Sequence, residues 1–185
     1  MKITLPDNTV REYPDGTTGI GIAKSISEGL ARNAVGIMVN GKTYDLSRKI
    51  NEDASIRILT FDDEEGKEIF WDSSAHLMAG AVSELFPGAK FGVGPSIENG
   101  FYYDIDLGDR KITIEDLPKI EQKMAELAKR SADYERIEIS WDEAVEFWKK
   151  AGDEYKVELL EGLKEDEITF YKQGNFIDLC RGTHI

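Results

Sequence analysis

An acidic run, Asp62 to Lys67, separates two stretches of this 185-residue chain that differ in hydrophobic periodicity. Before the run, the pattern is that of a compact unit of about sixty residues with strand-like alternation and one helical stretch. After it, the pattern is longer and more mixed. A chain of this length fits one large domain or two small ones. We therefore interpret the run as a solvated linker and predict two domains, 1–62 and 63–185.

The first sixty residues carry the signals of a small sheet crossed by one helix. Lys2–Leu5 and Thr9–Tyr13 alternate on either side of a Pro-Asp-Asn turn, which predicts a hairpin. Thr17 or Thr18 would cap a helix whose apolar face runs from Ile20 to Leu30. A short strand is predicted at Gly36–Val39, followed by a tight turn signal at Asn40-Gly41, and a closing strand is predicted at Ile56–Leu59.

The second stretch predicts an antiparallel sheet with helices packed on it. Helical spacing runs from Asp72 to Leu85 and from Ile114 to Leu127. A capping box at Ser140 to Glu143 opens a third helix, with Ala144, Val145 and Trp148 facing inward. Strand signals are found at Lys90 to Asp106, as one hairpin, and at Ile168–Tyr171 and Phe176–Leu179, as a pair. The fold class is therefore α+β.

The charge balance limits what the chain binds. Acidic residues outnumber basic ones 36 to 23, so the net charge is −13. Nucleic acid is a polyanion, and such a chain will not bind it non-specifically. The single cysteine, Cys180, excludes an internal disulfide and suits a reducing compartment. No apolar run is long enough for a membrane span or a secretory signal, so we expect a cytoplasmic protein without a membrane partner.

Five residues could bring chemistry to one pocket. The chain has two histidines, His76 and His184, and Asp72 precedes the first by one helical turn. Cys180 precedes His184 by four positions, and Asp178 would share a strand face with that cysteine if the strand continues. Such a set can move protons, bind a metal or orient a water. Spacing alone leaves purely structural roles open for each of them.

Three stretches resemble the bacterial threonyl-tRNA synthetase family, in that family's order: Phe70–Ala79, Gly94–Asp104 and Gln173–His184. The first sixty residues resemble the TGS domain with which these synthetases begin, a ubiquitin-like β-grasp fold. The resemblance implies that residues 63–185 form an α+β editing domain. No motif of the ATP-binding catalytic core or of an anticodon-binding region is present in the sequence.

The resemblance implies that this piece hydrolyses seryl-tRNA(Thr), the product of a charging error. Its partners would be the serine-carrying acceptor end of tRNA(Thr) and the rest of the synthetase chain. Zinc and ATP with magnesium are expected only in the catalytic core, so this piece would need no cofactor. We expect the isolated piece to be a monomer.

The same resemblance assigns roles to residues by position. The catalytic set would be Asp72, His76, Lys156, Cys180 and His184, and the substrate-binding set Asp178, Gly94, Pro95 and Arg181. The Lys156 charge would orient water or stabilise an oxyanion, and Asp178 would hold the substrate ammonium. Without the resemblance, Lys156 would be expected to be an exposed helix lysine.

Two positions depart from the family's pattern. Asp72 stands where the family has the first histidine of HxxxH, and Thr183 stands where it has a proline. A carboxylate is a weaker base than an imidazole, so we predict slowed hydrolysis. Four residues, Asp72, His76, Cys180 and His184, make a plausible zinc set, but we expect no metal there.

Two other functions compete with this interpretation. The chain could be a binding or regulatory module that has lost catalysis through Asp72. It could also be a free-standing proofreading factor that acts in trans. The end of the chain at Ile185, next to its own candidate site, favours a fragment of a synthetase over a free-standing factor.

Overall fold

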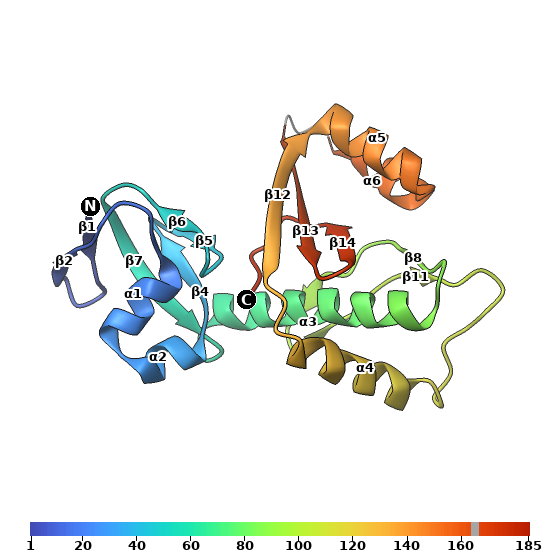
Figure 1. The fold of residues 1–185 in the computed structure, drawn as a ribbon, viewed down its shortest axis with the longest axis horizontal. Helices are drawn as coiled ribbons and strands as arrows, with labels where there is room; N and C mark the ends of the chain where they lie inside the picture. Colours follow the sequence, from blue (N-terminus) through green and yellow to red (C-terminus); the bar gives the residue numbers. More distant parts are fainter. Residues whose placement is uncertain (164–166) are drawn as a thin grey trace. The chain divides into compact units, whose positions relative to one another are not determined.

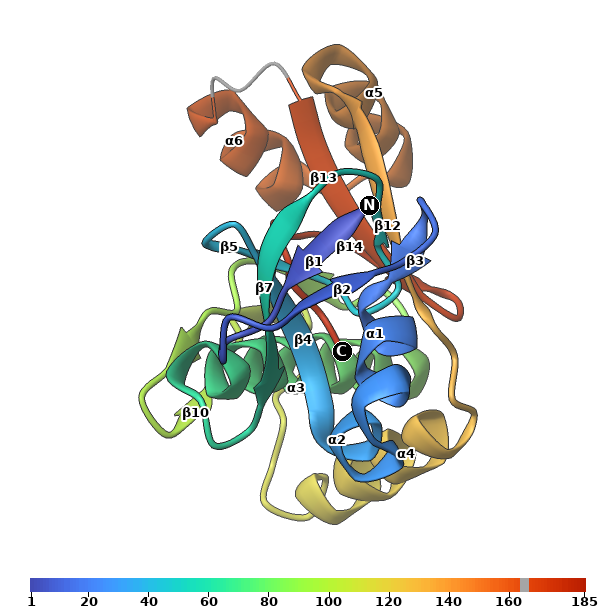
Figure 2. The same cartoon turned by 90° about the vertical axis from the view of Figure 1, so that its left-hand side faces the viewer.

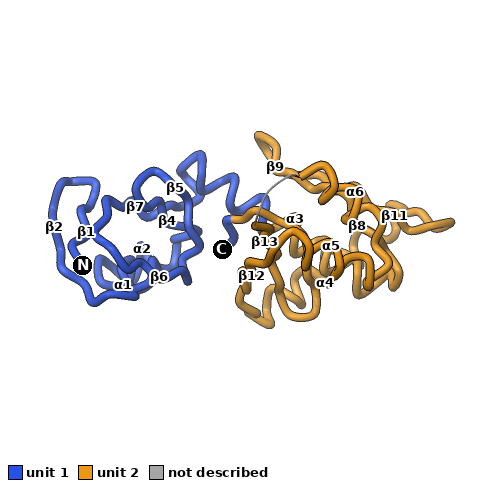
Figure 3. The backbone as a smooth tube through the Cα atoms, turned by 90° about the horizontal axis from the view of Figure 1, so that it is seen from above, with its two compact units in different colours: residues 1–73, 183–185 blue, residues 74–182 orange. Residues whose placement is uncertain are grey.

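The computed structural model describes residues 1–163 and 167–185 (Figure 1). The chain forms two compact units, coloured separately in Figure 3: residues 1–73 with 183–185, and residues 74–182. Helix α3 (Glu64–Leu85) begins in the first unit and continues into the second. The domain limits expected from the sequence, 1–62 and 63–185, remain predictions.

The first unit is built on a five-stranded sheet in the order β2-β1-β7-β4-β5. Its central pair, β1 and β7, is parallel, and the other neighbours are antiparallel. The strands are β1 (Lys2–Thr4), β2 (Val10–Glu12), β4 (Ala34–Val39), β5 (Lys42–Tyr44) and β7 (Ala54–Thr60), with a short pair of β3 (Thr17–Thr18) and β6 (Lys49–Ile50) beside them. This mixed sheet crossed by helix α1 confirms the predicted β-grasp unit.

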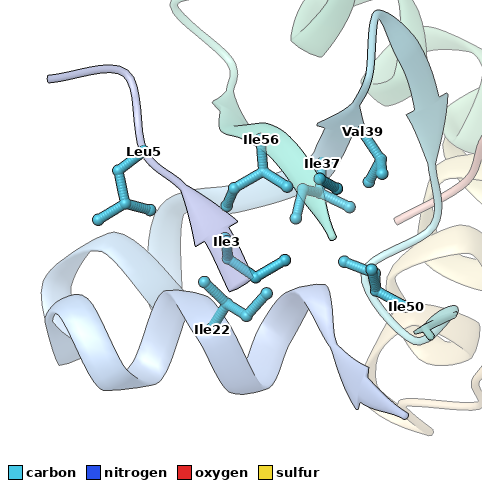
Figure 4. Close-up of a cluster of buried hydrophobic side chains, with 8 residues drawn as sticks. Ile3, Leu5, Ile22, Ile37, Val39, Ile50 and Ile56 are labelled. Carbon is cyan, nitrogen blue, oxygen red and sulfur yellow. The ribbon is translucent and has the colours of Figure 1, made fainter. Parts of the chain in front are cut away.

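The core of the first unit lies between this sheet and α1 (Gly19–Ile26). Ile22 on α1 and Ile3 on β1 approach each other in Figure 4, and both are fully buried. Their burial contributes about 2 kcal/mol for each large aliphatic side chain. The core consists of Ile3, Leu5, Ile22, Ile37, Val39, Ile50, Ala54 and Ile56.

The single helix predicted after Thr18 is two helices. Thr18 caps α1, as expected, but α1 ends at Ile26 and α2 (Glu28–Asn33) starts anew. Between them Ser27 is extended, and its side chain accepts a hydrogen bond from the backbone N–H of Leu30 at 3.0 Å. The spacing of the apolar residues does not predict this break, because it continues without interruption across Ser27. The signal for the break is the serine itself, since serine is a preferred N-cap residue.

The acidic run is not a linker along its whole length, since Glu64 to Lys67 form the first turn of α3. Asp63 accepts the backbone N–H of Thr60 at 2.8 Å and pairs with Arg57 at 2.6 Å. Arg57 also pairs with Glu65 at 2.9 Å. Acidic side chains favour a helix N-terminus, and one arginine offsets two of them. The charge run therefore starts a helix.

The second unit contains a three-stranded antiparallel sheet of β12 (Tyr134–Ser140), β13 (Glu167–Gln173) and β14 (Phe176–Leu179). The pairing of β13 with β14 confirms the predicted hairpin. Helices α5 (Trp141–Ala151) and α6 (Glu154–Gly162) lie next to each other and pack against this sheet (Figure 2). The predicted capping box at Ser140 is present, and Ala144, Val145 and Trp148 are buried. The sequence prediction missed β12 and α6.

The remainder of the second unit packs on the C-terminal part of α3. Helix α4 (Leu117–Lys129) buries Ile120, whereas Ile114 is 85% exposed and Leu117 is 49% exposed. The predicted helix therefore began too early. The predicted hairpin from Lys90 to Asp106 consists of two short pairs: β8 (Lys90–Phe91) with β11 (Ile105–Asp106), and β9 (Ser96–Ile97) with β10 (Gly100–Phe101). Within the described ranges, no helix has the length and apolar character that a membrane crossing requires.

Candidate functional site

A buried ion pair joins α6 to β14 in the second unit. The Nζ atom of Lys156 lies 2.6 Å from Oδ1 of Asp178, and both side chains are almost completely buried. Asp153 caps α6 by accepting the backbone N–H of Lys156 at 3.2 Å, which fixes where the helix starts and places Lys156 in its first turn. The alternative of an exposed helix lysine is therefore wrong.

Both members of the ion pair have further partners. Lys156 donates to the carbonyl oxygen of Gly92 at 2.8 Å. Asp178 accepts hydrogen bonds from the hydroxyl of Tyr103 and from the backbone N–H of Leu179. Burial raises the pKa of Asp178, and these donors oppose that rise by stabilising the ionised carboxylate. Burial also raises the pKa of Tyr103, so its hydroxyl stays protonated and donates. A substrate ammonium would therefore have to compete with Lys156 for Asp178.

His76 on α3 is a buried, neutral imidazole. Its ring contacts those of Tyr134 and Phe176 edge-on, with centroid distances of 5.2 and 4.9 Å. Burial, together with the nearby charge of Lys156, lowers the pKa of His76 to about 4. At pH 7 this imidazole carries no charge, so it can accept a hydrogen bond.

Two glycines allow close packing next to these residues. A Cβ atom at Gly94 would overlap the ring of Tyr103, and one at Gly182 would overlap the hydroxyl of Tyr171. Gly182 also has a φ of 74°, which favours glycine. Pro95 and Arg181, both predicted to bind substrate, are exposed.

Cys180 lies just beyond the end of β14. The strand ends at Leu179, so Cys180 does not continue the strand face of Asp178. Its backbone N–H donates to the carbonyl of Thr169 at 3.2 Å, and its Sγ accepts from the backbone N–H of Gly182 at 3.3 Å. The thiol is partly buried.

Asp72 and His184 belong to the first unit. His184 is almost completely buried, and its backbone N–H donates to Oδ1 of Asp45 at 2.8 Å. Its ring Nδ1 lies 3.2 Å from Oγ of Ser73. Asp72 is partly buried on α3, one turn before His76. That the five residues singled out by spacing share one pocket remains a prediction.

The positions of His, Cys, Asp and Glu side chains bear on the plausible zinc set of the sequence analysis. Among residues 1–163 and 167–185, no three His, Cys, Asp or Glu side chains are grouped in a way that could hold a metal ion. Lys156 and Tyr103 contact Asp178 instead, and Lys156 also donates to the Gly92 carbonyl. A cation, the Lys156 ammonium, is thus already paired with the buried carboxylate of Asp178.

Comparison with known proteins shows which proteins the chain is similar to. The TGS domain model matches residues 1–60. The chain is 56% identical over its whole length to threonine–tRNA ligase of Cytophaga hutchinsonii, 52% to that of Parabacteroides distasonis and 49% to that of Clostridioides difficile. Over its whole length the chain is similar to bacterial threonyl-tRNA synthetases. It matches the N-terminal region of these ligases and spans 28–29% of their length.

The sequence did not predict that Tyr103, Ser73 and Asp45 contact the candidate site residues. Tyr103 lies inside the stretch Gly94–Asp104, which resembles the synthetase family. That resemblance and the neighbouring aromatic residues are the sequence signals that could have pointed to Tyr103. Ser73 lies inside the Phe70–Ala79 stretch in the same way. Asp45, which is distant in sequence from His184, carried no signal at all.

Proposed function

We propose that this chain hydrolyses the ester bond of seryl-tRNA(Thr), as the editing part of a threonyl-tRNA synthetase acting in the cytoplasm. The substrate would be the acceptor end of tRNA(Thr) carrying serine. One observation carries the proposal: the ammonium of a buried lysine is held in place by a carboxylate and a carbonyl oxygen, as a fixed positive charge in the second unit.

The need for such a reaction follows from the two amino acids. Serine is threonine without one methyl group, and a pocket built for threonine rejects serine by only about 1–3 kcal/mol. A second pocket, too tight for that methyl group, admits serine and excludes threonine. Hydrolysis there removes the charging error.

The residues of the second unit suit ester hydrolysis. Water adds to the carbonyl carbon, an oxyanion forms, and the bond to the terminal ribose oxygen breaks as that oxygen takes up a proton. The Lys156 ammonium, held by Asp178 and Gly92, is a fixed positive charge for the oxyanion. The neutral ring of His76, a weak base because its pKa is lowered to about 4, can accept a hydrogen bond from the attacking water, and the proton that this water loses can pass to the ribose oxygen. None of these steps requires a metal ion.

A binding module without catalysis is the second candidate, and Asp72 is the residue that favours it. An ionised carboxylate accepts a proton weakly and donates none. If Asp72 has replaced the residue on which the reaction depends, the fold would retain an aminoacyl-tRNA pocket without turnover.

Replacement of Lys156 tests the proposal. Lys156→Met should lower the single-turnover rate of seryl-tRNA(Thr) hydrolysis about 100-fold, since removal of one fixed oxyanion partner costs that much in other esterases and proteases. Lys149→Met, on the exposed side of α5, is the matched control and should keep the rate.

Folding of the variant needs its own control, because removing one partner of a buried pair costs about 3–5 kcal/mol. The double variant Lys156→Met with Asp178→Leu removes both charges and should recover most of that loss, as circular dichroism during thermal unfolding would report. A folded double variant that hydrolyses seryl-tRNA(Thr) at the original rate would exclude this role for Lys156.

A further inference from the structure

Ser73 contacts His184 in the first unit, and its bonding pattern restricts the state of the imidazole. The Oγ atom of Ser73 lies within hydrogen-bonding distance of the carbonyl oxygen of Ile69 at 2.7 Å, the backbone N–H of Ile185 at 3.1 Å, and Nδ1 of His184 at 3.2 Å. Ser73 is buried, so these contacts are shielded from solvent.

A serine hydroxyl has one proton to donate and two lone pairs that accept. The carbonyl of Ile69 accepts only, so it takes the proton of the hydroxyl. The N–H of Ile185 donates only, so it uses one lone pair. The position left for Nδ1 of His184 is the second lone pair, and Nδ1 must therefore carry a hydrogen.

We propose that Ser73 is a positioning residue that fixes His184 in the Nδ1–H tautomer. In this tautomer the lone pair of the neutral ring is on Nε2, which becomes the atom that accepts a proton or a hydrogen bond. The ring atom opposite the serine is thereby prepared as the base, and the hydroxyl itself touches no substrate.

A second contact holds the backbone of the same residue. Oδ1 of Asp45 accepts the N–H of His184 at 2.8 Å, and Asp45 is itself buried. Asp45 lies in the stretch that matches the TGS domain. The β-grasp unit thus anchors the main chain of His184 while Ser73 fixes its ring, and the TGS domain contributes to the placement of the predicted catalytic histidine.

The use of this tautomer in ester hydrolysis rests on the proposed function, but the tautomer can be measured without it. The nitrogen-15 signals of a neutral imidazole distinguish a protonated ring nitrogen from an unprotonated one. The chain has only two histidines, so His76→Gln leaves His184 as the single imidazole. If that variant does not fold, His184→Gln identifies the signals by subtraction.

At a pH where His184 is neutral, we expect its Nδ1 to be protonated and its Nε2 unprotonated. Ser73→Ala should shift the population toward the Nε2–H tautomer, which free imidazole side chains favour in water. Ser73→Thr, which keeps the hydroxyl, should restore the original signals. Ser74→Ala, at the next position on α3, is the matched control and should leave them unchanged.

Hydrolysis gives an independent readout. Ser73→Ala should lower the single-turnover rate constant about tenfold without changing the protein concentration that gives half of the maximal rate. Protonated Nε2 in the unaltered chain, or an unchanged tautomer in Ser73→Ala, would overturn the inference. The expected tautomer in a chain that hydrolyses nothing would support the inference and contradict the proposed function instead.

Discussion

Asp72 is the residue whose chemistry departs most from the synthetase pattern. Its reference pKa is near 3.9 against about 6.5 for an imidazole, so at neutral pH it is the weaker base. Asp72→His should therefore accelerate seryl-tRNA(Thr) hydrolysis by at least about tenfold in single-turnover assays. An unchanged rate would mean that the carboxylate at this position does not limit the reaction.

The buried imidazole of His76 should make the free energy of unfolding depend on pH. Its folded-state pKa of about 4 lies below the ordinary value near 6.5, so the unfolded chain takes up a proton between these pH values that the folded chain excludes. The free energy of unfolding should fall by about 3 kcal/mol from this group as the pH drops from 6.5 to 4.

Urea unfolding at several pH values would measure that dependence. His76→Gln removes the imidazole, so the variant should lose this part of the pH dependence and keep the contributions of the other groups. Parallel pH curves for the two proteins would show that the imidazole is not held neutral by burial.

At the scale of single elements, the start of α3 depends on a glycine. A Cβ atom at Gly66 would overlap the backbone carbonyl of Thr60, and a backbone atom cannot move aside as a flexible side chain can. Gly66→Ala should therefore lower the free energy of unfolding by about 2 kcal/mol, although alanine is the better helix former.

Gly29 on α2 is the matched control for that substitution. The nearest atom to a Cβ there is 3.9 Å away, so Gly29→Ala should be neutral or stabilise the chain by up to about 1 kcal/mol. Thermal unfolding of the two variants measures the difference. Equal effects at both positions would contradict the close approach at Gly66.

The elements that the sequence predicted well are those with local signals. The Asn40-Gly41 turn, the Ser140 capping box and the β13–β14 hairpin each depend on residues within a few positions of one another. The break at Ser27 and the helical start at Glu64 were missed because capping competes with apolar periodicity, and periodicity was given more weight.

In the candidate site, too, the sequence identified individual residues better than it identified contacts between distant elements. The resemblance singled out Lys156 and Asp178, but composition and spacing did not predict that they form a buried pair 2.6 Å apart. Contacts of this kind join elements distant in sequence, such as Gly92 with α6 or Asp45 with His184, and they follow from tertiary packing alone.

For the whole molecule, the net charge of −13 bears on how tRNA is bound. Most affinity for nucleic acid comes from neutralised phosphates, and in this chain 36 acidic residues outnumber 23 basic ones, some of which are also paired with carboxylates. Under the proposed function, we therefore expect this chain by itself to bind tRNA weakly. Assays on the chain therefore need protein concentrations raised until the rate saturates.

The most direct test of the proposed function is a comparison of two substrates under single-turnover conditions. The unaltered chain, at saturating concentration, would be mixed with seryl-tRNA(Thr) and, separately, with threonyl-tRNA(Thr), and the loss of each ester would be followed against its spontaneous rate. We predict loss of serine well above the spontaneous rate, with threonine retained. Loss of both esters at their spontaneous rates, or equal acceleration of both, would contradict an editing site.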